Sequence, residues 1–175
     1  MADFTTAPKW FTWSLHEIGT RELDSNRGPA IRRYISLAHA GEEGDPWCAI
    51  FACAALESVG VRSTRSASPQ SFREEPSLFV GLDGPILGAI AVFWRGTRYS
   101  GKGHVGFYRG ESADGKYLYI LGGNEGDMVQ IEALPKDGHS MGLIGYWWPA
   151  GTPMPPVAKV LMPHDAPAHQ TVIVV

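Results

Sequence analysis

Residues 45–59 read DPWCAIFACAALESV, and this stretch decides the fold. From Cys48 to Val59 it is apolar on nearly every side, and Gly60 ends it. A helix that is apolar all round is buried in the core of its protein. We therefore predict a central helix over Cys48–Val59, surrounded by the rest of the chain.

Cys48 stands at the start of this predicted helix. Proline is favoured in the first turn of a helix, where its missing N–H has no intrahelical partner, and Pro46 precedes the cysteine closely. Cys48 is thereby placed among free backbone N–H groups at the positive end of the helix dipole, where a thiol ionises more readily. The thiolate is the nucleophile, so Cys48 is a candidate catalytic residue. The alternative is a small buried hydrophobic residue.

A nucleophilic thiol needs a base, and the candidate is His104 in the β-prone run GHVGFY at residues 103–108. Side chains alternate between the two faces of a strand, so His104 is predicted to share a face with Gly106 and Tyr108, opposite the core-facing Val105. Gly106 leaves space beside the imidazole for substrate. The alternative is a hydrogen-bonded strand histidine.

The third catalytic group is predicted in GGNEG at residues 122–126, which follow a hairpin with a turn at 114–115. The two glycines are predicted to serve turn geometry. A two-residue hairpin loop places Glu125 across from His104, and a three-residue loop places Asn124 there instead. A carboxylate or an amide oxygen can accept from one imidazole nitrogen and leave the other to take the thiol proton. Both residues remain candidates.

Several spaced motifs resemble those of a known family. They are DPWCA at 45–49, GAIAVF at 88–93, GHVGFY at 103–108 and LGGN at 121–124, together with PKW at 8–10, Gly19, Glu22, Asn26, Ile31 and Tyr34. In this order they resemble the CHAP/NlpC-type papain-like cysteine peptidases, which are peptidoglycan-cleaving amidohydrolases, in a compact bacterial and phage subgroup. The resemblance covers about residues 8–149.

This resemblance implies that Cys48 is the nucleophile, His104 the base and Asn124 the orienting third residue. The subgroup often has a glutamine after the Gly-Gly-Asn, whereas this chain has Glu125, whose carboxylate competes for the third role. The implied activity is hydrolysis of a stem-peptide amide of peptidoglycan, as an endopeptidase or an N-acetylmuramoyl-L-alanine amidase. The alternative class is a non-catalytic wall-binding or virion-associated structural module, which has no need for a positioned thiol.

Four further residues are predicted to contact the substrate. Three aromatic residues near the catalytic elements can line a groove for sugar or stem peptide, with core packing as the alternative: Trp47, Trp94 and Tyr108. Asn26, from the upstream motif, is the fourth. The histidines other than His104 show no paired ligand spacing with each other or with either cysteine, so we predict neither a metal site nor a cofactor.

The order of elements predicts an α+β fold, with helices first and strands second. Further helices are predicted at Pro8–Ile18, Pro29–Ala38 and Pro69–Glu75, and strands at Ala89–Trp94, His104–Arg109, Tyr117–Leu121, Met128–Ile131 and Leu143–Trp148. The resemblance implies a papain-like arrangement, in which the amino-terminal helices pack on a roughly five-stranded antiparallel sheet.

The length of the chain limits the number of domains, and its net charge limits the classes of binding partner. The 175 residues, 44% of them hydrophobic, fit one catalytic domain at 1–150 and a proline-rich tail at 151–175. The β-branched run Thr171–Val175 gives the tail a means to dock on a protein partner. A net charge of −3 without a Lys/Arg run argues against nucleic acid and anionic membranes as partners.

The two cysteines and the amino terminus indicate the cellular compartment in which the protein is made. Cys48 and Cys53 would lie roughly 8–9 Å apart on one helix, beyond disulfide reach. Met1–Phe4 lacks the basic and apolar regions of a secretory signal, and no run has membrane-spanning length. We expect synthesis in the cytoplasm and action at the cell wall after release or delivery, as in a phage or prophage endolysin or a secreted effector.

Overall fold

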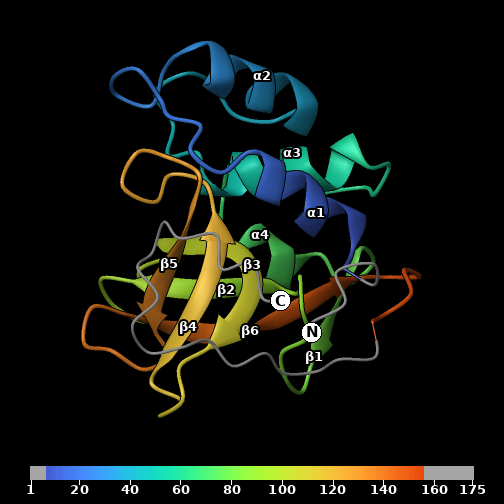
Figure 1. Cartoon of the computed structure of the whole chain (residues 1–175), viewed down its shortest axis with the longest axis vertical. Coiled ribbons are helices and arrows are strands. Elements are labelled where there is room, and N and C mark those ends of the chain that lie inside the picture. Colours follow the sequence, from blue (N-terminus) through green and yellow to red (C-terminus); the bar gives the residue numbers. More distant parts are fainter. Residues whose placement is uncertain (1–6, 156–175) are drawn as a thin grey trace.

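The computed structural model describes residues 7–155, in which four helices precede six strands (Figure 1). The helices are α1 (Lys9–His16), α2 (Pro29–Ala38), α3 (Cys48–Ser58) and α4 (Ser71–Glu74). The strands are β1 (Phe79–Leu82), β2 (Ile90–Arg95), β3 (Gly103–Glu111), β4 (Tyr117–Gly122), β5 (Gln130–Pro135) and β6 (Met141–Pro149). The predicted α+β class is confirmed.

The strands form one antiparallel sheet in the order β1-β6-β2-β3-β4-β5. It has six strands, so the prediction of about five was wrong, and the strand that was missed is β1. That strand has only four residues, includes Gly81 and, within residues 7–155, pairs with β6 alone. No nearby turn joins β1 to its partner, and a glycine weakens the strand pattern, so the local sequence does not reveal this strand.

The strand β5 begins later than predicted. Met128 pairs with Arg21 in an isolated bridge, and the neighbouring Val129 N–H bonds to Thr20 O at 2.9 Å. These residues therefore hold the segment after α1, and regular pairing with β4 starts only at Gln130. The loop between β4 and β5 is tied at its end to the amino-terminal part of the chain.

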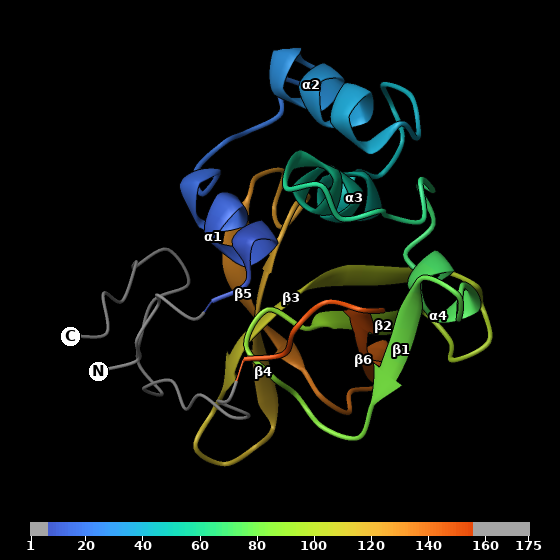
Figure 2. The same ribbon diagram turned by 90° about the vertical axis from the view of Figure 1, so that its right-hand side faces the viewer.

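The helix α3 is the core of the molecule. Every residue from Cys48 to Leu56 is buried, which confirms the prediction of a central buried helix. In both views α3 lies between α2 and the sheet (Figure 1, Figure 2). The helix α2 turns its apolar stripe of Ile31, Tyr34 and Ala38 inward. The start of α3 is thus held from above by α2 and from below by β3.

The first helix contacts segments that lie far from it in the sequence, including the last described strand, β6. In α1, Trp10 Nε1 donates to the Gly88 carbonyl at 2.9 Å, and the Trp10 ring lies 5.0 Å from the ring of Trp148 in β6. A tertiary contact between the first helix and the last strand closes the fold.

Among residues 7–155, no helix has the length and hydrophobicity needed to cross a bilayer. The first residues of the predicted tail lie against the sheet, since Trp148 Nε1 donates to Thr152 O at 2.9 Å. The rest of that tail, with the run Thr171–Val175, lies outside the described residues.

Candidate active site

Cys48 is the first residue of α3, directly after the N-cap residue Trp47. The first N–H to bond back along the helix is that of Phe51, to Trp47 O at 2.9 Å. The N–H of Cys48 therefore has no acceptor within its own helix. Pro46 lies before the N-cap rather than in the first turn, but the predicted position of the thiol at a helix start is confirmed.

Trp47 holds the residue before the thiol in place. Its ring is fully buried and stacks on Tyr34 with the ring centroids 5.9 Å apart. Its Nε1 donates to Glu22 Oε2 at 2.7 Å. The ring has no surface to offer a substrate, so the prediction of Trp47 as a groove residue was wrong. Sequence reasoning did not find the role of Glu22, which is to fix the approach to α3.

The other two predicted groove aromatics also belong to the core. Trp94 is only 9% exposed, and a Cβ on Gly142 would lie 2.7 Å from its Nε1. Tyr108 is fully buried and meets Tyr146 edge to face, with centroids 5.7 Å apart. The prediction was wrong for both residues because large rings stabilise most when they are buried, and the sheet is covered on both faces here.

His104, near the start of β3, lies between a thiol and a carboxylate. Its ring is 2% exposed and shares a hydrogen bond with Cys48, while its Nε2 forms a buried ion pair with Glu125 Oε1. Since Nε2 is taken by the carboxylate, Nδ1 is the nitrogen left to exchange a proton with the thiol. Three segments, α3, β3 and the β4–β5 loop, thus meet at one imidazole.

The positive charge of the His104 imidazolium and the negative charge of the Glu125 carboxylate stabilise each other. Burial disfavours the imidazolium, but the Glu125 carboxylate and the hydrogen bond with Cys48 outweigh burial, so the pKa of His104 is raised above its ordinary value. Burial alone would raise the pKa of Glu125, yet the charge of His104 lowers it overall. Both shifts favour an imidazolium beside a carboxylate, which fixes the orientation of the ring.

The hairpin register changes along its length. Near the tip, Glu111 lies opposite Leu118, which is the register of the two-residue loop. A bulge in β3 then shifts the pairing, and Phe107 lies opposite Leu121, which is the register of the three-residue loop. Each of the two alternatives predicted from the sequence therefore describes one part of the hairpin.

At the level of His104 the strand β4 has already ended, at Gly122. Asn124 adopts a left-handed φ of 59°, and its side-chain amide donates to Asn26 Oδ1 at 3.4 Å. The next residue, Glu125, reaches the imidazole instead. The structure therefore places Glu125, and not Asn124, against His104, in contrast to what the family resemblance implies.

Asn26 connects two loops of the site through its side-chain amide. Its Oδ1 accepts from Asn124, and its Nδ2 donates to Gly44 O at 3.2 Å. Its backbone N–H donates to Glu22 Oε1 at 2.8 Å. Asn26 joins the loop before α3 to the loop that carries Glu125, and its role as a substrate contact stays a prediction.

The glycine pair allows α3 and the β4–β5 loop to approach closely. Neither Gly122 nor Gly123 has a positive φ, so turn geometry does not require them, and that prediction was wrong. A Cβ on Gly123 would lie 2.6 Å from Phe51 Cβ and from Trp47 Cζ3. A Cβ on Gly122 would lie 3.2 Å from Glu125 Oε1. No side-chain atom fits at Gly123, and a side chain at Gly122 would press on the Glu125 carboxylate.

Gly123→Ala is expected to lower turnover and melting temperature together. The added methyl collides with the first turn of α3 and separates Cys48 from His104, and overpacking of this kind costs about 1–3 kcal/mol, or several degrees in Tm. Differential scanning calorimetry and a turnover assay measure both effects. Gly84→Ala is the control, since a Cβ there meets nothing within 4 Å. Equal effects of the two substitutions would contradict this account.

Glu132 stands behind the catalytic pair, on β5 opposite Ile120. Its hydrogen bond with Glu125, then burial, then the charge of Glu125 raise the pKa of Glu132 to about 7. A protonated Glu132 therefore donates to the Glu125 carboxylate. Sequence reasoning missed this residue because the predicted strand ended at Ile131, although a polar side chain within an otherwise apolar strand was the available signal.

Glu132→Gln is expected to raise the melting temperature relative to the native protein at about pH 8, and less so at about pH 5. In the unfolded chain Glu132 ionises near 4.5, whereas the folded protein keeps the proton up to about 7. The stabilisation from the proton is thus present below about 4.5 and is lost as the pH rises to about 7. Glutamine keeps a donor at every pH. A difference in Tm that does not change with pH would exclude the shared proton.

Comparisons of the chain with family models, with curated proteins and with solved structures find no match. Within residues 7–155, no group of three or more His, Cys, Asp or Glu side chains is arranged to hold a metal ion. The described site can bring a thiol, an imidazole and a carboxylate to one point, and this set is suited to nucleophilic catalysis by a thiolate.

Proposed function

We propose that this protein is a cysteine peptidase or amidase that hydrolyses an amide of the peptidoglycan stem peptide. The observation that carries the proposal is a pair of linked contacts at the start of a buried helix. Cys48, the first residue of that helix, shares a hydrogen bond with His104, and His104 forms an ion pair with Glu125. A structural histidine has no need of a thiol on one side and a buried carboxylate on the other. The substrate class rests on the resemblance of the sequence motifs to the CHAP/NlpC peptidases.

The proposal includes a papain-like fold. The nucleophile begins a buried helix, the base lies on a strand of an antiparallel sheet, and the orienting carboxylate follows the next strand. This arrangement supports the assignment that the sequence motifs imply, with Glu125 rather than Asn124 in the third position.

In the proposed mechanism, the Cys48 sulfur attacks the amide carbonyl carbon while Nδ1 of His104 holds the thiol proton. The C–N bond breaks as the imidazolium donates that proton to the leaving amine. Water then attacks the thioester, with His104 as the base, and releases the acid and the free thiol. Glu125 keeps Nε2 protonated throughout, so Nδ1 remains the nitrogen that exchanges the proton.

The tetrahedral intermediate carries negative charge on the former carbonyl oxygen, and this charge needs aimed donors. The N–H of Cys48 is one donor, because the first residue of a helix has no intrahelical acceptor. The positive end of the α3 dipole favours the same charge.

Mass spectrometry of the products from purified peptidoglycan tests the proposal. An amidase releases whole stem peptides with a free amino-terminal alanine, and an endopeptidase releases shortened stems or opened cross-bridges. Products from the native protein and none from Cys48→Ala are expected. Binding to the wall without any product would overturn hydrolysis and favour a wall-binding module.

A further inference from the structure

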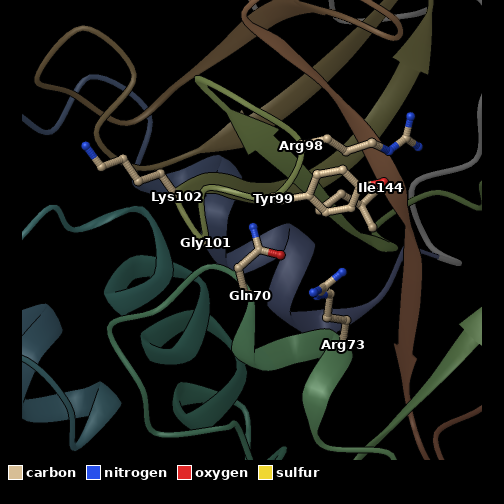
Figure 3. Close-up of a pocket in the computed structure, with 7 residues that line it drawn as sticks. All are labelled: Gln70, Arg73, Arg98, Tyr99, Gly101, Lys102 and Ile144. Atoms are coloured by element: carbon tan, nitrogen blue, oxygen red, sulfur yellow. The ribbon is translucent and has the colours of Figure 1, made fainter.

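A cavity of about 290 Å³ lies where α4 meets the loop between β2 and β3 (Figure 3). Its lining includes Gln70, Arg73, Arg98, Tyr99, Lys102 and Ile144. The lining contains three cations and no carboxylate, although the chain as a whole has a net charge of −3. We name this feature the basic cavity. Such a concentration of one charge in a concave site favours an anionic ligand.

The cations of the basic cavity are available to a ligand. Within the described part of the chain, no carboxylate lies within ion-pair distance of Arg98 or Lys102. Arg73 has Glu74 at 3.9 Å, and both side chains are exposed, so this contact holds the guanidinium weakly. In Figure 3 the Arg73 side chain and the Tyr99 ring lie nearest the amide of Gln70, while the charged ends of Arg98 and Lys102 extend away from it toward the rim.

Gln70 points to the chemistry of the ligand. Its side chain is 5% exposed, and its Nε2 donates to the Phe93 carbonyl at 3.2 Å. Its Oε1 is buried and has no hydrogen-bond donor among the described residues. A buried acceptor without a donor destabilises the folded protein. A ligand that brings an N–H as well as negative charge removes this cost.

A peptide with a free carboxylate supplies both groups. Its amide N–H can meet Gln70 Oε1 while the carboxylate meets the cations, and its aliphatic part can pack on Tyr99, whose side chain is 95% exposed. A hydrogen phosphate ion also brings a donor, in its O–H, but it has no aliphatic part to cover the Tyr99 ring. The exposed ring therefore favours an acidic peptide over a simple anion.

The basic cavity adjoins the catalytic strand. Lys102 immediately precedes β3, which begins at Gly103 and carries His104. Phe93, whose carbonyl holds Gln70, is the ladder partner of His104 between β2 and β3. The basic cavity therefore adjoins the pair of strands, β2 and β3, that positions the imidazole of the candidate active site.

We propose that the basic cavity binds a free carboxylate of the substrate peptide and so selects acidic peptides at one side of the amide that is cut. The proposal rests on the proposed hydrolysis by Cys48, and the stem peptide of peptidoglycan carries such carboxylates. The cavity then contributes to substrate choice, and the Cys48 site contributes the bond cleavage.

Two stem-peptide substrates that differ only in a free carboxylate or a carboxamide test this proposal. The native protein is expected to prefer the acid by about tenfold in kcat/KM. In the double variant Arg98→Gln, Lys102→Gln the preference disappears through a higher KM for the acid, while the carboxamide is cut as before. Lys116→Gln, at the distant hairpin turn, is the control and should keep the preference. Equal cleavage of both peptides by the native protein would overturn the proposal.

Binding to the inactive Cys48→Ala protein separates the two proposals. Calorimetry is expected to give tighter binding of the acid than of the carboxamide, with the difference lost in the double variant. If the native protein cuts neither peptide while this difference holds, hydrolysis fails and the carboxylate site stands. If inorganic phosphate displaces the acid at equal concentration, the basic cavity is a general anion site and the peptide-selecting role is overturned.

Discussion

Replacement of Cys48 by alanine is expected to abolish amide hydrolysis, with a loss in kcat of at least about 10³-fold. The reason is that no other described group can supply the attacking sulfur to an amide beside His104. The melting temperature should stay near the native value, because the substitution removes one small side chain that makes few contacts outside the site. Turnover of peptidoglycan fragments and thermal unfolding measure the two outcomes.

Cys53 supplies the matched control for the thiol. It is fully buried, with its sulfur 3.5 Å from Thr64 Oγ1, whereas Cys48 retains 5% exposure. Cys53→Ala should therefore keep its turnover, and iodoacetamide should label Cys48 first. Retained turnover in Cys48→Ala would exclude covalent catalysis by the thiol, and equal labelling of both cysteines would remove the argument from accessibility.

Glu125→Ala is expected to lower turnover by about 10²- to 10⁴-fold, far more than Asn124→Ala. Without the carboxylate, the buried imidazole loses its partner at Nε2 and with it a fixed orientation. Asn124→Ala removes a 3.4 Å contact with Asn26 and strains the left-handed backbone at this position, but it leaves the carboxylate on the imidazole. Glu125→Gln keeps an acceptor without the charge and should fall between the two. The opposite ranking of Glu125→Ala and Asn124→Ala would return the third role to Asn124.

The elements that could be predicted from the sequence are those with a strong local pattern. The helix α2 has a regular apolar stripe, and α3 is apolar all round, so both were expected close to their observed bounds. The strand β1 could not be expected, because its partner in the described sheet is the distant β6. Pairing between remote segments leaves no mark in a short stretch of sequence.

In the site, too, the residues that depend on local sequence patterns could be predicted, and those that depend on remote contacts could not. Cys48 and His104 could be predicted, since a helix start and a strand are local features. The choice between Asn124 and Glu125 could not, because it depends on a bulge in β3 and on where β4 ends. Burial of the aromatic rings likewise depends on which faces of the sheet are covered, and that is a property of the complete fold.

The contact between Trp10 and Trp148 can form only after β6 has been synthesised, so the fold that holds the site is completed late in translation of the described elements. Translation delivers α1 early and β6 last among the described elements, so the ribosome releases the Trp148 partner of the first helix only after every other described element. Until then β2 and β1 lack the strand that joins them, and Trp10 of α1 lacks the ring of Trp148. A nascent chain therefore carries the thiol long before it carries a finished scaffold, and any amide hydrolysis belongs to the completed protein alone.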